Sequence, residues 1–251
     1  DVHIHLLTLF PEVCRPYLDA SIVGRAQKSG NLRVSLHDIR DYATDRHHVT
    51  DDAPYGGGGG MIIKPEPVFA AVESIVGREH DISEIILLTP QGRLFSQDAA
   101  LKLAKLDQII LIAGRYEGFD ERIRKYLVTD EISVGDYVVT GGELPALLVV
   151  DAIARLIPGV LGAVGAAEKD SHGESGILEH PHYTRPVNFR GWDVPDVLLS
   201  GNHEKIANWR KKQSLRRTWQ RRPELLIDTQ LSEYEKECIA ELAEESVVKW
   251  K

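Results

Sequence analysis

Four glycines at the ends of apolar segments give this sequence its clearest chemical signal. Gly114 and Gly135 each follow an apolar run, and the pair Gly141 and Gly142 opens a helical pattern. A glycine carries no side chain, so a ligand can approach the main chain there. The main-chain N–H and C=O groups can then hydrogen-bond to the edge of an adenine or to a ribose. One such glycine indicates only a tight turn. Four of them at two strand ends favour a backbone-lined ligand pocket.

A second glycine-rich stretch, residues 56–60, lies in a long segment without hydrophobic periodicity. A P-loop needs Lys and then Ser or Thr after the glycines, but here Met61 follows them and Lys64 precedes a proline. No helical pattern begins at the offset that a dinucleotide-binding fingerprint requires. We therefore predict a loop that either faces a substrate or is a flexible connection.

Cysteine and histidine spacings do not indicate a metal centre. Cys14 and Cys238 are far apart in the sequence, which is typical of buried thiols rather than of a disulfide framework or a zinc site. His180, His182 and His203 match no ligand spacing of a known kind. We predict no bound metal and no cysteine nucleophile.

The net charge of -8 conceals a strong separation of charge along the chain. Residues 205–222 contain eight cations and no acid, with Trp209 and Trp219 among them. A local basic face can bind a phosphate backbone whatever the net charge. This segment predicts RNA binding; the alternative is a solvated charged face whose tryptophans belong to a core.

These candidate sites depend on elements that can be read from the hydrophobic pattern. Apolar runs predict strands at 2–10, 32–36, 84–89, 108–113 and 131–134. Helical patterns lie between them at 18–28, 67–76, 96–106 and 145–157, and Pro145 opens the last. Pro11 is expected to end the first strand. The alternation predicts an α/β fold, a parallel sheet with helices on both faces.

The composition changes after this region to Gly, Ala, Glu, Ser and His without an apolar period, which predicts a linker at 163–178. We expect an α/β domain at 1–162 and a small all-helical C-terminal domain at 179–251. In the latter, one helix runs through Trp209, a second lies around 215–219, and the last starts at Ser232. Ser232 and Glu235 have the spacing of a capping box.

The 251 residues, 43% of them hydrophobic, are sufficient for a real core. No stretch approaches the roughly 18 apolar residues of a membrane helix, and the amino terminus lacks the layout of a signal peptide. We expect a globular protein without a membrane partner, located in the cytoplasm.

Several motifs, taken in their order, resemble one family of RNA-modifying enzymes. They are DDAPYGGG at 51–58, TPQG at 89–92, GRYEG at 114–118, VGDY at 134–137, GGE at 141–143, PGVLG at 158–162, PHYTRP at 181–186, LSGNH at 199–203 and RRPELL at 221–226. Together they span nearly the whole chain and resemble the bacterial tRNA (guanine-N(1))-methyltransferases, the TrmD type of the SPOUT class. One departure is Gly59, which takes the place of a proline common in this family and should loosen the loop.

The resemblance implies more than the patterns indicate. It implies that a deep trefoil knot in the α/β domain binds S-adenosyl-L-methionine, whereas periodicity alone favours an ordinary sheet because knots are rare. It also implies a homodimer with active sites at the interface, and methylation of the tRNA guanosine immediately 3′ of the anticodon. Mg2+ stays open as a further cofactor for activity.

The resemblance also assigns residues to these roles. The cofactor-binding residues that it implies are Leu88, Thr89, Pro90, Gly114, Tyr116, Glu117, Val134, Gly135, Tyr137, Val139, Gly141, Gly142 and Pro145. The expected tRNA-binding residues, from the loop and the basic segment, are Asp51, Lys205, Arg210, Lys211, Arg216 and Arg217.

Asp170 and Arg155 match the catalytic pair of this family. Methylation at N(1) of guanine requires the proton on that nitrogen to leave, so a base such as Asp170 is needed. Negative charge then spreads to the neighbouring exocyclic oxygen, where Arg155 would stabilise it. By pattern alone, Asp170 is typical of a solvated linker acid, and Arg155 of a cation that complements a helix dipole.

Two other functions stay open as alternatives. The first is a non-catalytic RNA-binding protein that retains the fold, and binding of S-adenosylmethionine would discriminate it from the enzyme. The second is an ATP-dependent enzyme that uses the glycine loop, which the missing Lys-Ser/Thr pair disfavours.

Overall fold

The computed structural model describes residues 2–79, 81–115, 117–161, 170–173, 175–227 and 229–248. The chain divides into two compact units, residues 1–164 and residues 165–251. Residues 163–169 and 174 of the predicted linker lie outside the described residues, so the linker and the domain boundaries at 162 and 179 stay predictions.

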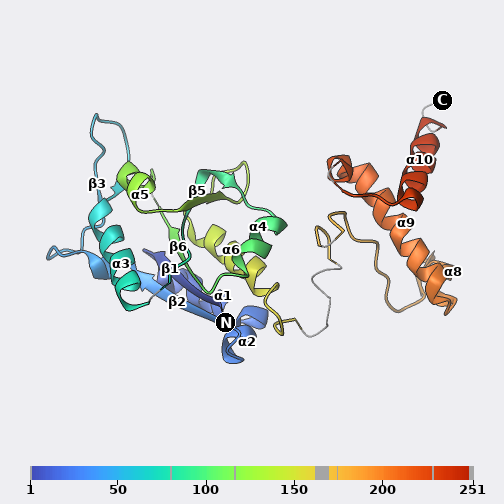
Figure 1. Ribbon diagram of the computed structural model, residues 1–251, viewed down its shortest axis with the longest axis horizontal. Helices are drawn as coiled ribbons and strands as arrows, with labels where there is room; N and C mark the ends of the chain where they lie inside the picture. Colours follow the sequence, from blue (N-terminus) through green and yellow to red (C-terminus); the bar gives the residue numbers. More distant parts are fainter. Residues whose placement is uncertain are drawn as a thin grey trace. The chain divides into compact units, whose positions relative to one another are not determined.

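The first unit is built on a five-stranded sheet in the order β2-β1-β6-β5-β7 (Figure 1). Its strands are β1 (Val2–Thr8), β2 (Leu32–Asp38), β5 (Glu84–Leu94), β6 (Gln108–Ala113) and β7 (Asp130–Ser133). Every neighbouring pair is parallel. The predicted parallel sheet is therefore confirmed.

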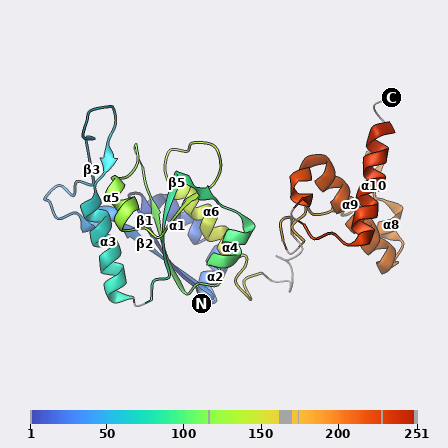
Figure 2. The same cartoon turned by 45° about the horizontal axis from the view of Figure 1, so that its top comes forward.

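Helices cover both faces of this sheet, as predicted (Figures 1 and 2). The helices on one face are α1 (Pro11–Leu18), α2 (Ser21–Lys28), α4 (Gln97–Leu103) and α6 (Glu143–Ala154), and those on the other are the 3-10 helix η1 (Ile39–Tyr42), α3 (Pro65–Arg78) and α5 (Glu121–Tyr126). Successive residues of a strand point to opposite faces. Ile4 of β1 accordingly joins the core beneath α6, while Leu7 joins the core beneath α3.

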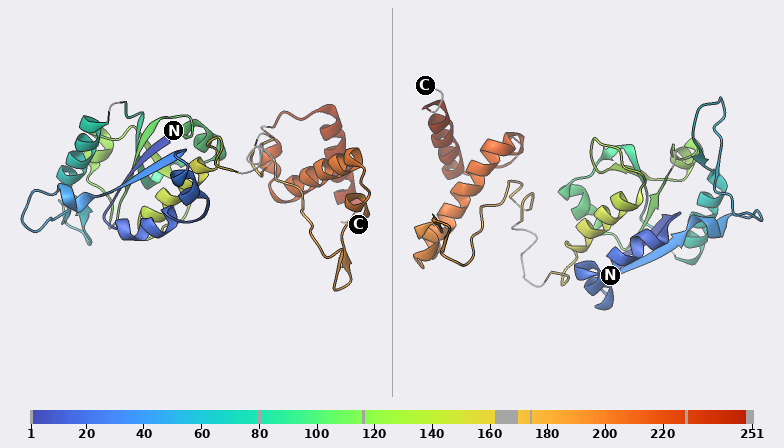
Figure 3. Two further views of the ribbon diagram at one scale, coloured as in Figure 1. Left: turned by 90° about the horizontal axis from the view of Figure 1, so that it is seen from below. Right: turned by 180° about the vertical axis from the view of Figure 1, so that it is seen from behind.

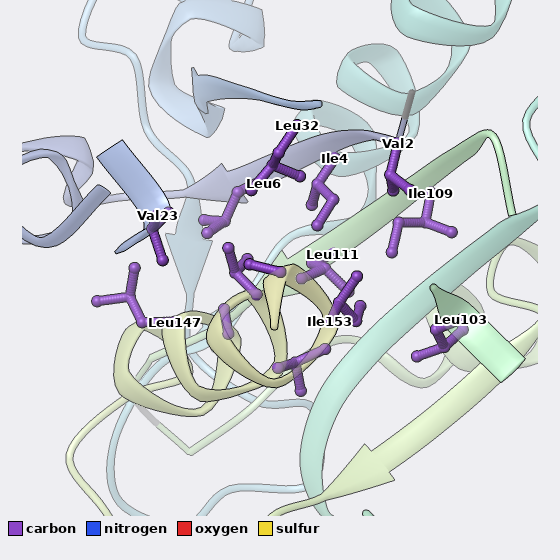
Figure 4. Packing of buried hydrophobic residues seen from close by; sticks show 14 of the residues in the cluster. Val2, Ile4, Leu6, Val23, Leu32, Leu103, Ile109, Leu111, Leu147 and Ile153 are labelled. Carbon is purple, nitrogen blue, oxygen red and sulfur yellow. The ribbon is translucent and has the colours of Figure 1, made fainter. Parts of the chain in front are cut away.

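Helix α6 is the centre of the larger core. Ile153 lies by Leu111 of β6 and Leu147 by Val23 of α2, all in one cluster (Figure 4), and α1, α2 and α4 pack against the helix. Burying one Leu or Ile side chain stabilises a fold by about 1.5–3 kcal/mol, so α6 is a firm anchor for the segment that precedes it. No helix among the described residues has both the length and the apolar composition needed to cross a membrane.

Several boundaries in the first unit differ from those predicted. The single helix expected at 18–28 is replaced by α1 and α2, and Pro11 begins α1 instead of only ending the strand. Proline is accepted at the first helical position because its missing N–H would have no partner there. Helix α6 likewise begins at Glu143, ahead of Pro145, and β5 continues past Pro90 to Leu94.

The segment between η1 and α3 is a long loop, as predicted, and it extends away from the sheet (Figure 3). It contains a short antiparallel ladder of β3 (Asp51–Asp52) and β4 (Ile62–Ile63). The N–H of Ile63 donates a hydrogen bond of 2.9 Å to the carbonyl of Gly118. The base of the glycine loop is therefore joined to the segment that follows β6.

The second unit contains α8 (Asp196–Leu199), α9 (His203–Arg221), the 3-10 helix η2 (Pro223–Leu226) and α10 (Glu233–Val248). Leu215 of α9 packs with Ile177 and with Cys238 and Leu242 of α10. The predicted capping box is confirmed. The N–H of Ser232 donates to the Glu235 carboxylate (2.8 Å), and the N–H of Glu235 donates to the Ser232 hydroxyl (3.3 Å).

Two predictions for this unit are wrong. It is not all-helical, because β8 (Asn188–Phe189) and β9 (Trp192–Asp193) form a hairpin. Arg190 and Gly191 at its turn both have positive φ angles, 56° and 85°, as a two-residue hairpin turn requires. The two helices expected within 201–219 are one continuous helix, α9, because no residue in that stretch breaks it.

Candidate functional site

A cavity of about 290 Å³ lies at the carboxyl ends of β5, β6 and β7. Ligands of parallel α/β sheets bind at this edge, where the loops after the strands meet. The cavity is lined by twelve of the residues that the sequence suggested for cofactor binding, namely Leu88, Thr89, Pro90, Gly114, Glu117, Val134, Gly135, Tyr137, Val139, Gly141, Gly142 and Pro145. Tyr116, the remaining residue of that set, lies outside the described residues.

The first wall of the cavity comes from an excursion within β5. Ile132 of β7 pairs with Leu88 and again with Arg93, so residues 89–92 leave the ladder and return to it. A Cβ atom on Gly92 would stand 2.5 Å from the backbone carbon of Glu131. Only glycine permits this return, and it places Thr89 and Pro90 at the cavity.

The second wall is the segment 134–142, which returns from β7 to the end of β6. The N–H of Gly142 donates a 2.7 Å hydrogen bond to the carbonyl of Gly114. A Cβ atom on Gly142 would lie 2.8 Å from Cα of Ala113 and from the nitrogen of Gly114. Gly142 is thus needed for close contact between two backbone segments, in addition to preceding the first residue of α6.

A buried carboxylate joins the elements around this wall. Glu143, the first residue of α6, is 2% exposed. Its Oε1 accepts a hydrogen bond of 2.8 Å from the hydroxyl of Thr8, and its Oε2 accepts one of 3.1 Å from Nε of Arg115. The Arg115 guanidinium also lies over the ring of Phe10, 4.4 Å from the ring centroid. One side chain therefore connects the ends of β1 and β6 to the start of α6.

Arg124 holds the opposite side of the cavity. Its Nη2 donates to the hydroxyl of Thr89 at 2.9 Å, and its Nε lies 3.1 Å from a carboxylate oxygen of Glu131. Arg124 is 18% exposed in its side chain, so the guanidinium is held in place between two strand ends. This contact orients Thr89, a residue that the sequence had already indicated.

Sequence reasoning missed part of the lining. The residues that it did not name are Gln91, Arg115, Gly118, Phe119, Arg124, Ile132, Ser133, Val138 and Thr140. Most of them are neighbours in sequence of residues that it did name, so widening each motif would have found them. Arg124 is different, because it enters from α5 and only the packing of that helix against the strand ends brings it to Thr89.

A buried thiol lies close to this region. Cys14 of α1 is fully buried. Burial, and then the negative charge of Glu143, raises the pKa of the Cys14 thiol to about 11. The Cys14 thiol is therefore protonated at neutral pH, which disfavours it as a nucleophile.

The two residues suggested for catalysis belong to different compact units. Arg155 caps α6, where its N–H donates a 3.2 Å hydrogen bond to the carbonyl of Asp151. Asp170 lies in a turn closed by a 2.9 Å hydrogen bond from the N–H of Gly173 to its carbonyl. Both side chains are half-buried. Their pairing stays a prediction, as do their roles.

The predicted RNA-binding cations lie on α9, and part of their charge is neutralised by α10. Nζ of Lys211 lies 2.6 Å from the carboxylate of Glu235, and Nζ of Lys212 lies 2.7 Å from that of Glu241. The acidic stretch near the end of the chain thus packs against the basic helix. Sequence order alone separates these residues, whereas the helix pair brings them together.

The other cations of α9 differ in their exposure. Lys205 and Arg210 are exposed, while Arg216 and Arg217 are half-buried, and Arg217 donates a 3.0 Å hydrogen bond to the carbonyl of Glu179. Arg210 also lines a second cavity, of about 340 Å³, together with residues 180–185. Asp51, the remaining residue suggested for tRNA binding, pairs with Ile63 across the ladder of the glycine loop.

The two tryptophans of α9 have different surroundings. Trp219 packs against the core of the second unit, as the alternative interpretation of the tryptophans held. The ring centroid of Trp209 lies 6.5 Å from that of Tyr183, beside the second cavity that Tyr183 lines.

Comparisons with known proteins agree with one another. A family model described as tRNA (Guanine-1)-methyltransferase TrmD matches residues 2–228. A protein of Dehalococcoides mccartyi named tRNA (guanine-N(1)-)-methyltransferase is 54% identical over 244 residues, which cover 97% of this chain and 98% of that protein. Proteins of the same name from Anoxybacillus flavithermus and Bacillus subtilis are 53% and 50% identical, covering 94% and 96% of this chain and 96% and 99% of their own.

Proposed function

This chain belongs to the tRNA (guanine-1)-methyltransferase family of the TrmD type, and from that premise we propose that it methylates tRNA at N(1) of the guanosine immediately 3′ of the anticodon. The methyl donor in this proposal is S-adenosyl-L-methionine. A tRNA substrate also fits the cytoplasmic location expected from the sequence.

The cavity at the ends of β5, β6 and β7 is the observation that carries the proposal. Its volume, about 290 Å³, is just below the usual range for small-molecule sites, about 300–1,000 Å³. Gly114, Gly135 and Gly141 line the cavity with main chain alone, which suits the adenine edge and the ribose, and the Glu117 carboxylate suits a hydroxyl or a cation. The bound cofactor supplies a methyl group on a sulfonium, which is already activated for transfer.

The chemistry left to the protein is removal of one proton and stabilisation of one charge. In the proposed reaction the N(1) proton passes to the carboxylate of Asp170, and the electron pair left on N(1) forms the new N–C bond. An ordinary aspartate, with a pKa of about 3.9, is a weak base. Donation by Arg155 to the exocyclic oxygen stabilises the charge that develops there and makes the N(1) proton more acidic.

We propose the knot and the dimer on further grounds in the first unit. β7 pairs with β5 at the edge of the sheet, yet Gly142 bonds to Gly114 at the end of β6, so the segment between must cross the end of β5. This path supports the trefoil knot. Leu144 and Leu148 of α6 expose apolar side chains, as does Tyr17 of α1, whose hydroxyl donates to Asp151 of the same helix, and this surface supports the homodimer expected for the family.

tRNA binding in this proposal uses the cations of α9. Exposed Lys205 and Arg210 would contact phosphates, so that replacing Lys205 with alanine should lower the salt dependence of binding by about one released counterion. Lys211 is paired with Glu235 and is expected to contribute less.

The test measures transfer of labelled methyl from S-adenosylmethionine to unmodified tRNA transcripts. One transcript carries guanosine after the anticodon, and its partner carries adenosine there. The proposal expects methylation of the guanosine transcript alone, and a fall of about 100-fold or more for Asp170→Asn. Asp196→Asn, which changes an exposed acid of the same unit, serves as the matched control and should retain activity.

Three outcomes would contradict parts of the proposal. Activity of Asp170→Asn close to wild type would refute the base assignment. Equal methylation of both transcripts would refute the target position. Tight tRNA binding without transfer would favour the non-catalytic RNA-binding alternative. Repeating the assay with EDTA decides whether Mg2+ takes part.

A further inference from the structure

A group of histidines lies on β1 and β2, in the half of the sheet away from the cavity. His3 and His5 alternate in β1 with Ile4 and Leu6, which belong to the core beneath α6. The two histidines therefore point to the other face, on which α3 packs. They are 8% and 3% exposed, and nothing in the proposed reaction uses them.

The ring nitrogens of this group are held by neighbours on β2. Nε2 of His3 lies 2.9 Å from the hydroxyl of Ser35, and Nδ1 of His5 lies 3.1 Å from Nε2 of His37. The other nitrogen of His5, Nε2, is buried, and the Gln108 side chain forms a hydrogen bond with His5 that a cation bound there would replace.

A carboxylate completes the group. Glu79 directly follows α3 and is half-buried. His3, His5 and Glu79 each offer a ligand atom, and these atoms lie within 4.8 Å of one another. Two imidazoles and one carboxylate form a donor set typical of zinc.

The histidines are also in the protonation state that metal binding needs. Burial, followed by the nearby charges of His5 and Arg33, lowers the pKa of His3 to about 4, and burial also lowers the pKa of His37 to about 4. Burial lowers the pKa of His5 as well, against the opposite effect of its hydrogen bond with Gln108. Neutral imidazoles keep a lone pair for a cation at neutral pH.

We propose that His3, His5 and Glu79 bind a zinc-type divalent cation that links β1 to the end of α3. His5 binds through Nε2, and its Nδ1–H donates to His37, which fixes the ring as an outer partner does in metal sites. Ser35 has the same role for His3, which binds through Nδ1. The three ligand atoms lie within 4.8 Å of one another. Bonds of about 2.0–2.2 Å to one shared metal require shorter separations, so these atoms must approach one another by roughly 1 Å. Rotation of the Glu79 side chain at the helix end supplies much of that movement.

The sequence pattern did not indicate this site. His3 and His5 are two residues apart on a strand, and Glu79 is more than seventy positions further along the chain. The position of α3 over this face brings Glu79 to the two histidines of β1. Parallel pairing of β1 with β2 brings Ser35 and His37 to the same histidines.

A second group of possible ligands must be separated from the first. Glu179, His180 and His182 of the other unit also offer atoms within 4.8 Å of one another. His182 is exposed, however, and its Nε2 already lies 2.6 Å from the Glu179 carboxylate. Exposed acid–histidine contacts of this kind are common without a metal.

The test uses the full-length chain, stripped of metal with EDTA and desalted. Co2+ is titrated while its visible absorption is followed, and Zn2+ then displaces it. The proposal expects one tight equivalent of Co2+ in a site of low coordination number, and a metal-dependent rise of the thermal midpoint. His5→Asn and Glu79→Gln should weaken binding at least 10-fold, His37→Phe should weaken it about 10–100-fold, and His182→Asn should bind as wild type does.

The outcomes separate the proposal from a metal-free histidine group. Absence of stoichiometric binding by the wild-type chain would overturn it, as would wild-type affinity in Glu79→Gln. Loss of binding in His182→Asn with retention in His5→Asn would place the metal in the second unit. Glu79→Gln changes a half-buried residue at a helix end, so it keeps the test valid should His5→Asn fail to fold. Because no methylation is measured, failure of the proposed function leaves these results unaffected.

Discussion

Replacing Glu143 with alanine tests whether one buried carboxylate holds the cavity wall together. The change removes the acceptor of the Thr8 hydroxyl and of Arg115 Nε. A hydrogen bond to a charged group contributes about 1.5–3 kcal/mol. Because the Arg115 side chain is 27% exposed, water can solvate part of the charge that is left unpaired. The loss of the Arg115 hydrogen bond therefore costs less than the upper value of that range.

We expect Glu143→Ala to lower the free energy of unfolding of the first unit by about 3 kcal/mol, which corresponds to a fall in the thermal midpoint of roughly 6–12 °C. Glu143→Gln keeps the side-chain volume and an acceptor for Thr8, so it should cost about half as much. The matched control is Asp98→Ala. Asp98 is also an acid in the first turn of a helix and pairs with Lys102 at 2.7 Å, but both side chains are more than 70% exposed.

The assay is urea unfolding followed by far-ultraviolet circular dichroism. Fluorescence is unsuitable because all four tryptophans lie beyond residue 164 and report on the second unit. The control should lose less than about 1 kcal/mol, as exposed ion pairs do. An alanine variant within about 0.5 kcal/mol of wild type, or a control that loses as much as Glu143→Ala, would refute the reasoning.

Three further predictions follow from single contacts. Gly142→Ala should lower the free energy of unfolding, followed in a thermal scan, by about 1–3 kcal/mol, because its Cβ would meet backbone at 2.8 Å. Gly59→Ala has open space around it and should have no such effect. Equal effects of the two changes would contradict the close approach at Gly142. Cys14, with a thiol pKa of about 11, should resist iodoacetamide in the native protein and react in urea, as peptide mass mapping would reveal; stoichiometric native labelling would count against its burial. Partial burial acts to raise the pKa of Glu235, but hydrogen bonds from Lys211 and Ser232 outweigh burial and hold that pKa below 4.5. The ionised carboxylate therefore stabilises the second unit above pH 4.5, and this stabilisation is lost as the pH falls through the lowered pKa. Tryptophan-monitored urea unfolding of wild type and Glu235→Gln should therefore converge in acid, and a constant difference would rule this linkage out.

The sequence by itself determined the five parallel strands of the first unit and the position of the cavity. Apolar runs such as 108–113 can be buried only between two layers, so they predict strands of a covered parallel sheet. Strand ends of such a sheet meet at one edge, and the glycines that follow them, Gly114 and Gly135, line the cavity found there. The strands and the glycines at their ends depend on neighbouring residues, so local sequence patterns predict them.

Only the tertiary structure decided which distant residues meet. Glu143 binds Thr8 across 135 positions of sequence, and His3 lies near Glu79 because α3 packs over β1. The excursion of β5 and the hairpin at Arg190 depend on pairing and turn geometry, which hydrophobic periodicity does not record. The physical reason is common to all of them. A side chain's partner across a fold is set by strand order, register and helix placement, and these follow from the burial of the whole chain rather than from the residues next to it.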